Sequence, residues 1–81
     1  MDREAGNQFM IFNDRLRLLR TEQGLTQKQM ADMLGLTERN YQRYESDGPM
    51  PRYKMLLEIA DYFGVSLDYL FGRTEKRELN L

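Results

Sequence analysis

The amino-acid sequence predicts an all-α fold of five helices, and three observations support this prediction. Apolar residues recur at helical spacing along most of the chain. Threonine or serine precedes several of these runs, where its hydroxyl can accept a hydrogen bond from a free backbone N–H. Glycine follows the runs, and glycine readily adopts the left-handed conformation that ends a helix. The 81 residues suffice for one small domain, near the lower size limit for a stable hydrophobic core.

Residues 1–11 are predicted to be a flexible N-terminal segment, because the chain begins with polar residues and includes Gly6. The apolar run at residues 9–12 has three interpretations: it begins the first helix early, it forms a strand, or it covers a partner. We favour packing within the chain or across a dimer. The acidic, polar start does not resemble a signal peptide, and the run is too short to span a membrane. A cytoplasmic location is therefore expected.

The first helix is predicted at about residues 13–23. Phe12, Leu16 and Leu19 have the i, i+4, i+7 spacing of a buried helical face. Gly24 follows as the residue that ends the helix.

The second helix is predicted at residues 27–34. Thr26 is its N-cap candidate, and Gln29, three residues later, can complete a capping box. Gly35 can end the helix in the left-handed conformation. One face of the helix is apolar, formed by Met30, Ala31 and Leu34.

The third helix is predicted at residues 38–45, after a tight turn at Gly35. Thr37 is its N-cap candidate. Its large apolar residues are Tyr41 and Tyr44, which lie three apart and therefore on one face. We expect both tyrosines to pack in the core.

The opposite face of this third helix carries side chains that can hydrogen-bond to base edges in the major groove of DNA. Any exposed helix carries polar residues, and for this helix alone that simpler interpretation would be preferred. The short turn, the two N-caps and the small Ala31 favour instead a helix-turn-helix whose second helix points outward. The candidate base-contacting residues are Glu38, Arg39, Asn40, Gln42 and Arg43.

The remaining chain predicts two more helices and a short tail. Residues 46–52 contain Gly48 and two prolines, which favour a turn-rich loop. A fourth helix is expected at about residues 52–63, ending at Gly64. A fifth is expected at residues 67–71, capped by Ser66. Residues 74–81 form a short charged tail. The fourth helix should bury Met55, Leu56, Ile59, Ala60 and Phe63.

Composition argues against enzymatic chemistry. The chain has no cysteine and no histidine, which removes disulfides, thiolate ligands, the commonest zinc ligand and the usual general base. Its acidic residues are scattered among basic ones, and no glycine-rich phosphate loop is present. We therefore expect neither an enzyme nor a metal or cofactor site. The net charge of −1 argues against a non-specific nucleic-acid coat but is compatible with a specific binder.

The pattern of Gln27, Ala31, Gly35, Tyr41 and Tyr44, followed by Glu45, resembles the helix-turn-helix of the Cro/CI-type (XRE) repressor family. The resemblance extends over residues 12–73, which would form a compact, lambda-repressor-like DNA-binding domain with five helices. It implies a sequence-specific regulator of transcription that binds double-stranded DNA, acts as a repressor and forms a homodimer on a two-fold symmetric operator.

The resemblance also assigns roles to particular residues. An arginine in the first helix of the family pairs with the acid that ends the third helix, which here implies an ion pair between Arg20 and Glu45. The residues expected to contact DNA phosphates are Thr26, Gln27, Thr37 and Arg52. Apart from the resemblance, we expect dimerisation through the fifth helix and its flanks, because five short helices leave these near one end of the domain. The expected interface residues are Leu57, Tyr69, Leu70 and Phe71.

Two features leave a second function open. Family members often carry lysine or arginine in the loop after the third helix, whereas this loop has Asp47, Gly48, Pro49 and Met50. The overall charge is also slightly acidic. The alternative is a protein-interaction module, such as an antitoxin or a regulator controlled by a partner protein. Specific DNA binding should weaken steeply with salt, whereas binding through an apolar patch should change little.

Overall fold

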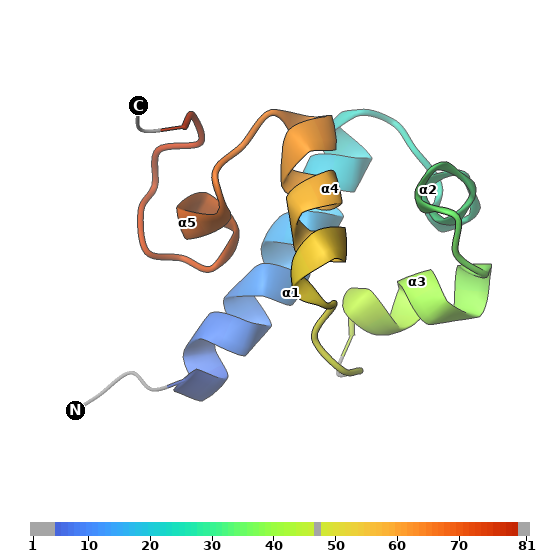
Figure 1. Ribbon diagram of the computed structural model, residues 1–81, viewed down its shortest axis with the longest axis horizontal. Coiled ribbons are helices and arrows are strands. Elements are labelled where there is room, and N and C mark those ends of the chain that lie inside the picture. The colour runs from blue at the N-terminus through green and yellow to red at the C-terminus, as the bar shows by residue number, and fades with distance from the viewer. Residues whose placement is uncertain (1–4, 47, 80–81) are drawn as a thin grey trace.

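The computed structural model describes residues 5–46 and 48–79, with side chains from residue 11 onward (Figure 1). Within these residues the chain is all-α, without a strand, as the sequence predicts. The helices are α1 (Ala5–Glu22), α2 (Gln27–Leu34), α3 (Glu38–Tyr44), α4 (Tyr53–Phe63) and α5 (Leu67–Leu70).

Helix α1 begins earlier than the sequence pattern predicts. It starts at Ala5 rather than near Asn13, so residues 9–12 lie within the helix. This is the first of the three interpretations of that apolar run. No proline or glycine lies between Asn7 and Glu22, so nothing in the chain interrupts the helix. Residues 1–4 lie outside the described residues.

The helix-turn-helix has the capping that the sequence predicts. The Thr26 hydroxyl accepts from the Gln29 backbone N–H at 3.0 Å, and the Gln29 side chain accepts from the Thr26 N–H at 2.8 Å. Gly35 ends α2 with φ 73°, in the left-handed region that glycine tolerates best. The Thr37 hydroxyl caps α3 by accepting from the Asn40 N–H at 3.1 Å. These caps fix where each helix begins and ends.

A single core joins the helices. Tyr41, the one residue of α3 that is fully buried, connects this helix to the core. Met55, Leu56 and Phe63 of α4 are only partly buried and pack around it. The buried hydrophobic residues are Phe12, Leu16, Leu19, Met30, Ala31, Tyr41, Ile59, Ala60, Val65, Tyr69 and Leu70.

Helices α2 and α3 lie together on one side of α1 and α4, and α5 lies on the other (Figure 1). Helices α3 and α5 are therefore at different ends of the molecule. Among the described residues, no helix is both long and apolar enough to cross a membrane.

The segment after α5 is bound to the domain rather than extending away from it. Arg15 of α1 donates to the backbone oxygens of Tyr69 and Thr74, at 2.5 and 3.0 Å. Arg77 forms two 2.8 Å bonds to the Glu22 carboxylate. Both guanidinium groups lie against the Tyr69 ring, 4.2 and 5.2 Å from its centroid. The sequence pattern identified this segment only as a charged tail.

Candidate nucleic-acid interface

Helix α3 is fixed through its tyrosines and leaves its other side chains in solvent. Tyr41 is fully buried, and Tyr44 is half-buried. The two rings meet edge to face with centroids 6.3 Å apart. All five candidate base-contacting side chains are exposed: Glu38, Arg39, Asn40, Gln42 and Arg43.

The candidate phosphate contacts lie at helix N-termini. Thr26 and Thr37 are exposed, and each hydroxyl already accepts a backbone N–H, which leaves its own O–H free to donate. Arg52 is exposed and occupies the N-cap position of α4, where its side chain makes no capping hydrogen bond. These positions carry the positive ends of helix dipoles, which favour an anion.

Gln27 differs from the other phosphate candidates because its side chain is half-buried and already bonded within the protein. Its amide nitrogen donates to Glu45 Oε1 at 3.1 Å. A primary amide has two N–H groups and one oxygen, so the second N–H stays available for a ligand. The sequence pattern did not indicate this contact, because it depends on how α2 crosses the end of α3.

Arg20 and Glu45 form the expected ion pair, and it is buried. Arg20 Nε lies 2.6 Å from Glu45 Oε2, and Arg20 Nη2 lies 3.0 Å from Oε1. Only 12% of the Arg20 side chain and 2% of the Glu45 side chain are exposed. The Tyr41 hydroxyl also donates to the Glu45 carboxylate. One carboxylate therefore joins α1, α2 and α3.

The electrostatics of this cluster favour charged Arg20 and Glu45 with neutral Tyr41. Burial alone would raise the pKa of Glu45, but hydrogen bonds from Arg20, Tyr41 and Gln27 outweigh burial and lower it. The hydrogen bond to Glu45 raises the pKa of Arg20. Burial, followed by the bond to Glu45, raises the pKa of Tyr41. The charges of the pair therefore stay fixed at neutral pH.

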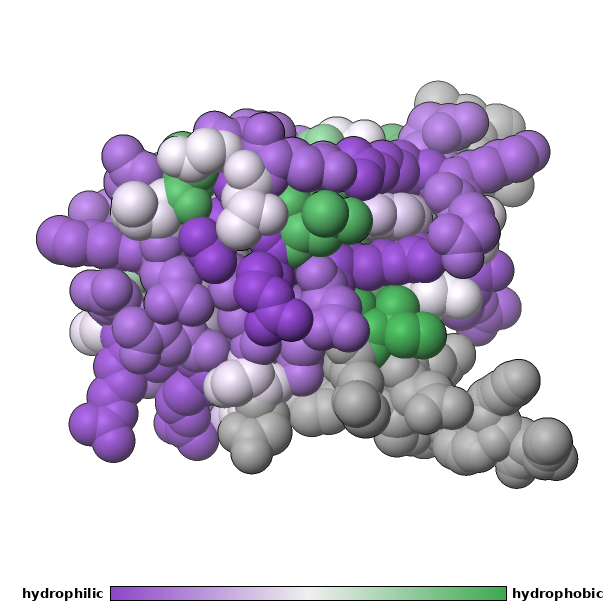
Figure 2. Space-filling view, turned by 180° about the vertical axis from the view of Figure 1, so that it is seen from behind, coloured by the Kyte–Doolittle hydropathy of each residue, from purple (hydrophilic) through white to green (hydrophobic). Residues whose placement is uncertain are grey.

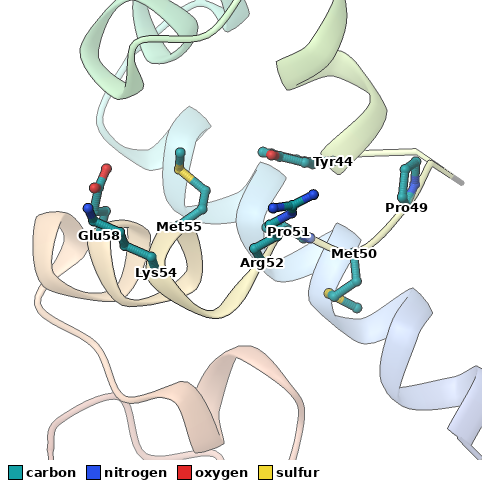
Figure 3. A pocket seen from close by; sticks show the side chains of 8 residues that line it. All are labelled: Tyr44, Pro49, Met50, Pro51, Arg52, Lys54, Met55 and Glu58. Atoms are coloured by element: carbon teal, nitrogen blue, oxygen red, sulfur yellow. The ribbon is translucent and has the colours of Figure 1, made fainter.

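A hollow lies between the end of α3 and the start of α4. Figure 3 shows Tyr44 facing Arg52, with Met55 and Glu58 further along α4. Lys54 is exposed at the far end of the hollow, where Figure 3 shows its side chain next to Glu58. It is lined by Tyr44, Pro49, Met50, Pro51, Arg52, Lys54, Met55 and Glu58.

The loop before this hollow approaches α3 closely. A Cβ on Gly48 would lie 2.5 Å from the Arg43 Cβ, so only glycine fits without a shift. The Gly48 N–H donates to the Arg43 backbone oxygen at 3.0 Å. Asp47, which the family resemblance compares with a basic residue, lies outside the described residues.

The residues expected at the dimer interface have different exposures. Tyr69 and Leu70 are buried in the core of the single chain, at 5% and 0% exposure. Their side chains are therefore not available as a dimer surface in this conformation. Leu57 and Phe71 are half-buried and keep accessible area, although the Phe71 ring stacks on Phe12 at 5.3 Å.

Exposed hydrophobic side chains do not gather on one element. They come from α1, α2, α4 and the C-terminal segment, as Leu18, Met33, Tyr53, Tyr62 and Leu79. Figure 2 shows one face of the molecule, where hydrophobic side chains appear as separate spots among hydrophilic ones. In residues 5–46 and 48–79, no cluster of three or more acidic side chains is arranged to hold a metal ion.

Comparison with known proteins identifies the same region. The family model described as "Helix-turn-helix" matches residues 16–70. The chain is 39% identical over 64 residues to the SPbeta prophage-derived uncharacterized HTH-type transcriptional regulator YonR of Bacillus subtilis, covering 79% of this chain and 59% of that protein. It is 43% identical over 60 residues to the uncharacterized HTH-type transcriptional regulator YqaE of B. subtilis, covering 74% and 52%.

A third relative comes from a phage of another bacterium. The chain is 39% identical over 75 residues to the cryptic phage CTXphi transcriptional repressor RstR of Vibrio cholerae, covering 89% of this chain and 67% of that protein. The chain thus spans little more than half the length of the two B. subtilis relatives. No solved structure gives a significant match.

Proposed function

We propose that this chain, which belongs to the helix-turn-helix family, binds double-stranded DNA sequence-specifically and regulates transcription. The family match covers residues 16–70 and agrees with the Cro/CI-type resemblance of the sequence. The main support for the proposal is the orientation of α3 relative to the core. Its buried Tyr41 faces the core, and five polar side chains of the same helix are exposed.

In this proposal α3 enters the major groove, and Arg39 and Arg43 are the principal readers. They lie four residues apart on the exposed side of the helix, so both can reach the groove floor. Arginine can donate two hydrogen bonds to guanine O6 and N7, the commonest specific contact. Glu38 could accept from a cytosine amino group, while Asn40 or Gln42 could pair with adenine.

Phosphate contacts would set the position of α3 without reading sequence. Thr26 and Gln27 at the start of α2, and Thr37 at the start of α3, are suited to this role by their helix N-termini. Arg52 would contact phosphate on the other side of α3.

The active form would be a homodimer on a two-fold symmetric operator in the cytoplasm. One α3 of seven residues covers few base pairs, and paired recognition helices about 34 Å apart would meet successive major grooves. Of the residues predicted at the interface, Leu57 and Phe71 have accessible area. Repression is the proposed outcome, and the name of the RstR relative supports it.

Selection of bound DNA from a random double-stranded pool tests this function. We expect one enriched motif with two-fold symmetry, whose binding weakens steeply with added salt because counterions are released from phosphates. An absence of any enriched motif would contradict the proposal. Binding to a protein partner that hardly changes with salt would favour the interaction-module alternative instead.

A further inference from the structure

The buried carboxylate of Glu45 forms the ion pair with Arg20 and also accepts a hydrogen bond from Gln27, a candidate DNA contact. Glu45 is the C-cap residue of α3, and Arg20 holds it through two hydrogen bonds. Tyr41 donates a third, and the residue is only 4% exposed. With three donor atoms fixing it, this carboxylate cannot move to suit a fourth donor. It therefore acts as a fixed acceptor inside the domain.

The fourth donor to this carboxylate comes from Gln27, the first residue of α2. The amide nitrogen of Gln27 donates to Glu45 Oε1 at 3.1 Å across 18 positions of sequence. An ionised carboxylate can only accept hydrogen bonds, so it requires the amide nitrogen, and not the amide oxygen, to face it. The pKa of Glu45 is lowered, so this requirement holds at neutral pH. Glu45 thereby selects one of the two possible orientations of the Gln27 amide.

We propose that Glu45 is a positioning residue for DNA binding, which orients the Gln27 amide so that its second N–H faces a phosphate at the start of α2. The inference rests on the proposed function and deepens it. Without the carboxylate, a free glutamine side chain would rotate among several conformations and lose entropy when a phosphate fixed it. With the carboxylate, that entropy is already lost when the protein folds.

A double-mutant cycle on the selected DNA tests the proposal. Affinity is measured for the wild type, Gln27→Ala, Glu45→Gln and the double variant, under conditions where circular dichroism shows each to be folded. Gln27→Ala should weaken binding roughly tenfold or more, equally for all DNA sequences. Glu45→Gln should weaken the wild type similarly and leave the affinity of Gln27→Ala unchanged. A merely structural role for Glu45 predicts the same loss in both backgrounds.

Two further variants complete the test. Gln27→Asn leaves the buried ion pair intact but is one methylene too short to reach Glu45, so it should bind as weakly as Gln27→Ala. It keeps the proposal falsifiable even if Glu45→Gln does not fold, because wild-type affinity in Gln27→Asn would refute it. The control is Ile59→Val, a core change on α4 that should lower the melting temperature without changing affinity.

The proposal is overturned if Gln27→Asn binds like the wild type, or if Glu45→Gln weakens Gln27→Ala as much as it weakens the wild type. It is also overturned if the wild type binds DNA and Gln27→Ala binds with the same affinity, and in that case the proposed function survives. If the wild type selects no DNA at all, the proposed function fails and this inference fails with it.

Discussion

At the scale of single residues, the cluster around Glu45 is the main polar feature of the interior. Its partners come from α1, α2 and α3, so the cluster both stabilises the fold and holds α3 in position. The sequence resemblance implied the Arg20–Glu45 pair. It did not imply the contributions of Tyr41 and Gln27, because a motif records which residues recur but not how their side chains share one acceptor.

Removing one member of the buried ion pair should strongly destabilise the fold. Glu45→Ala leaves the Arg20 charge without its partner at 12% exposure, and the free energy of unfolding should fall by about 3 kcal/mol or more. The matched control is Asp14→Ala, which removes the exposed Asp14–Arg17 pair at 68% and 51% exposure and should cost less than about 1 kcal/mol. Urea denaturation measures both, and equal losses would contradict the account.

The pH dependence of stability should carry the signature of Glu45. Its pKa is lowered on folding from a usual value of 4.5, so the unfolded chain binds the proton more readily. The stabilisation is therefore complete above about pH 4.5 and is lost as the pH falls through the lower pKa of the folded state. Denaturation between pH 7 and pH 3 should show this loss in the wild type. In Glu45→Gln the free energy of unfolding should fall less over this pH range. If the variant and the wild type lose the same free energy, Glu45 is not the group responsible.

At the scale of elements, the sequence predicted the helix-turn-helix almost completely. The signals for α2 and α3 are local: a capping threonine before each helix and Gly35 between them. Local hydrogen bonds depend on residues three or four apart, so a single sequence contains them. The start of α1 was not predicted, because no capping residue or breaker marks it and the apolar run at residues 9–12 allowed several structures.

The N-cap of α3 provides a test at this scale. The Thr37 hydroxyl satisfies the Asn40 N–H, so Thr37→Ala should lower the free energy of unfolding by about 1 kcal/mol. Thr21→Ala is the control, because the Thr21 hydroxyl only bonds back to Arg17 and Leu18 carbonyls within α1. That bonding slightly destabilises a helix, so Thr21→Ala should be near neutral. Thermal unfolding measures both variants. An unchanged free energy of unfolding in Thr37→Ala would contradict the capping role.

At the scale of the whole molecule, α5 and the segment after it enclose the end of the domain opposite α3 (Figure 1). The contacts of Arg15 with Tyr69 and Thr74, and of Arg77 with Glu22 of α1, join residues 54 to 59 positions apart in sequence. No local pattern encodes such contacts, so the sequence indicated only a charged tail. The same limitation affected the dimer prediction: the apolar character of Tyr69 and Leu70 reflects the core of one chain.

Loss of Arg15 should release the C-terminal segment. Arg15→Ala leaves the backbone oxygen of Thr74 without its donor and removes one of the two donors to the Tyr69 oxygen, which should cost about 1–3 kcal/mol. The Ser66 N–H donates to the Arg77 backbone oxygen at 2.7 Å. Release of the segment in Arg15→Ala should break this hydrogen bond more often, so hydrogen exchange of the Ser66 N–H should accelerate. Arg73→Ala removes only an exposed pair with Asp68 and serves as the control. Unchanged exchange at Ser66 in Arg15→Ala would contradict this role.

Readout of DNA sequence by α3 can be measured by repeating the binding-site selection with variants of this helix. Arg39→Ala and Arg43→Ala should each cost about 1–3 kcal/mol on the best site and relax the preference at one base pair per half-site. Thr26→Ala, which alters the phosphate candidate at the N-cap of α2, should weaken binding to all sequences alike and return the wild-type motif. If both arginine variants return the wild-type motif unchanged, readout by these side chains of α3 is contradicted.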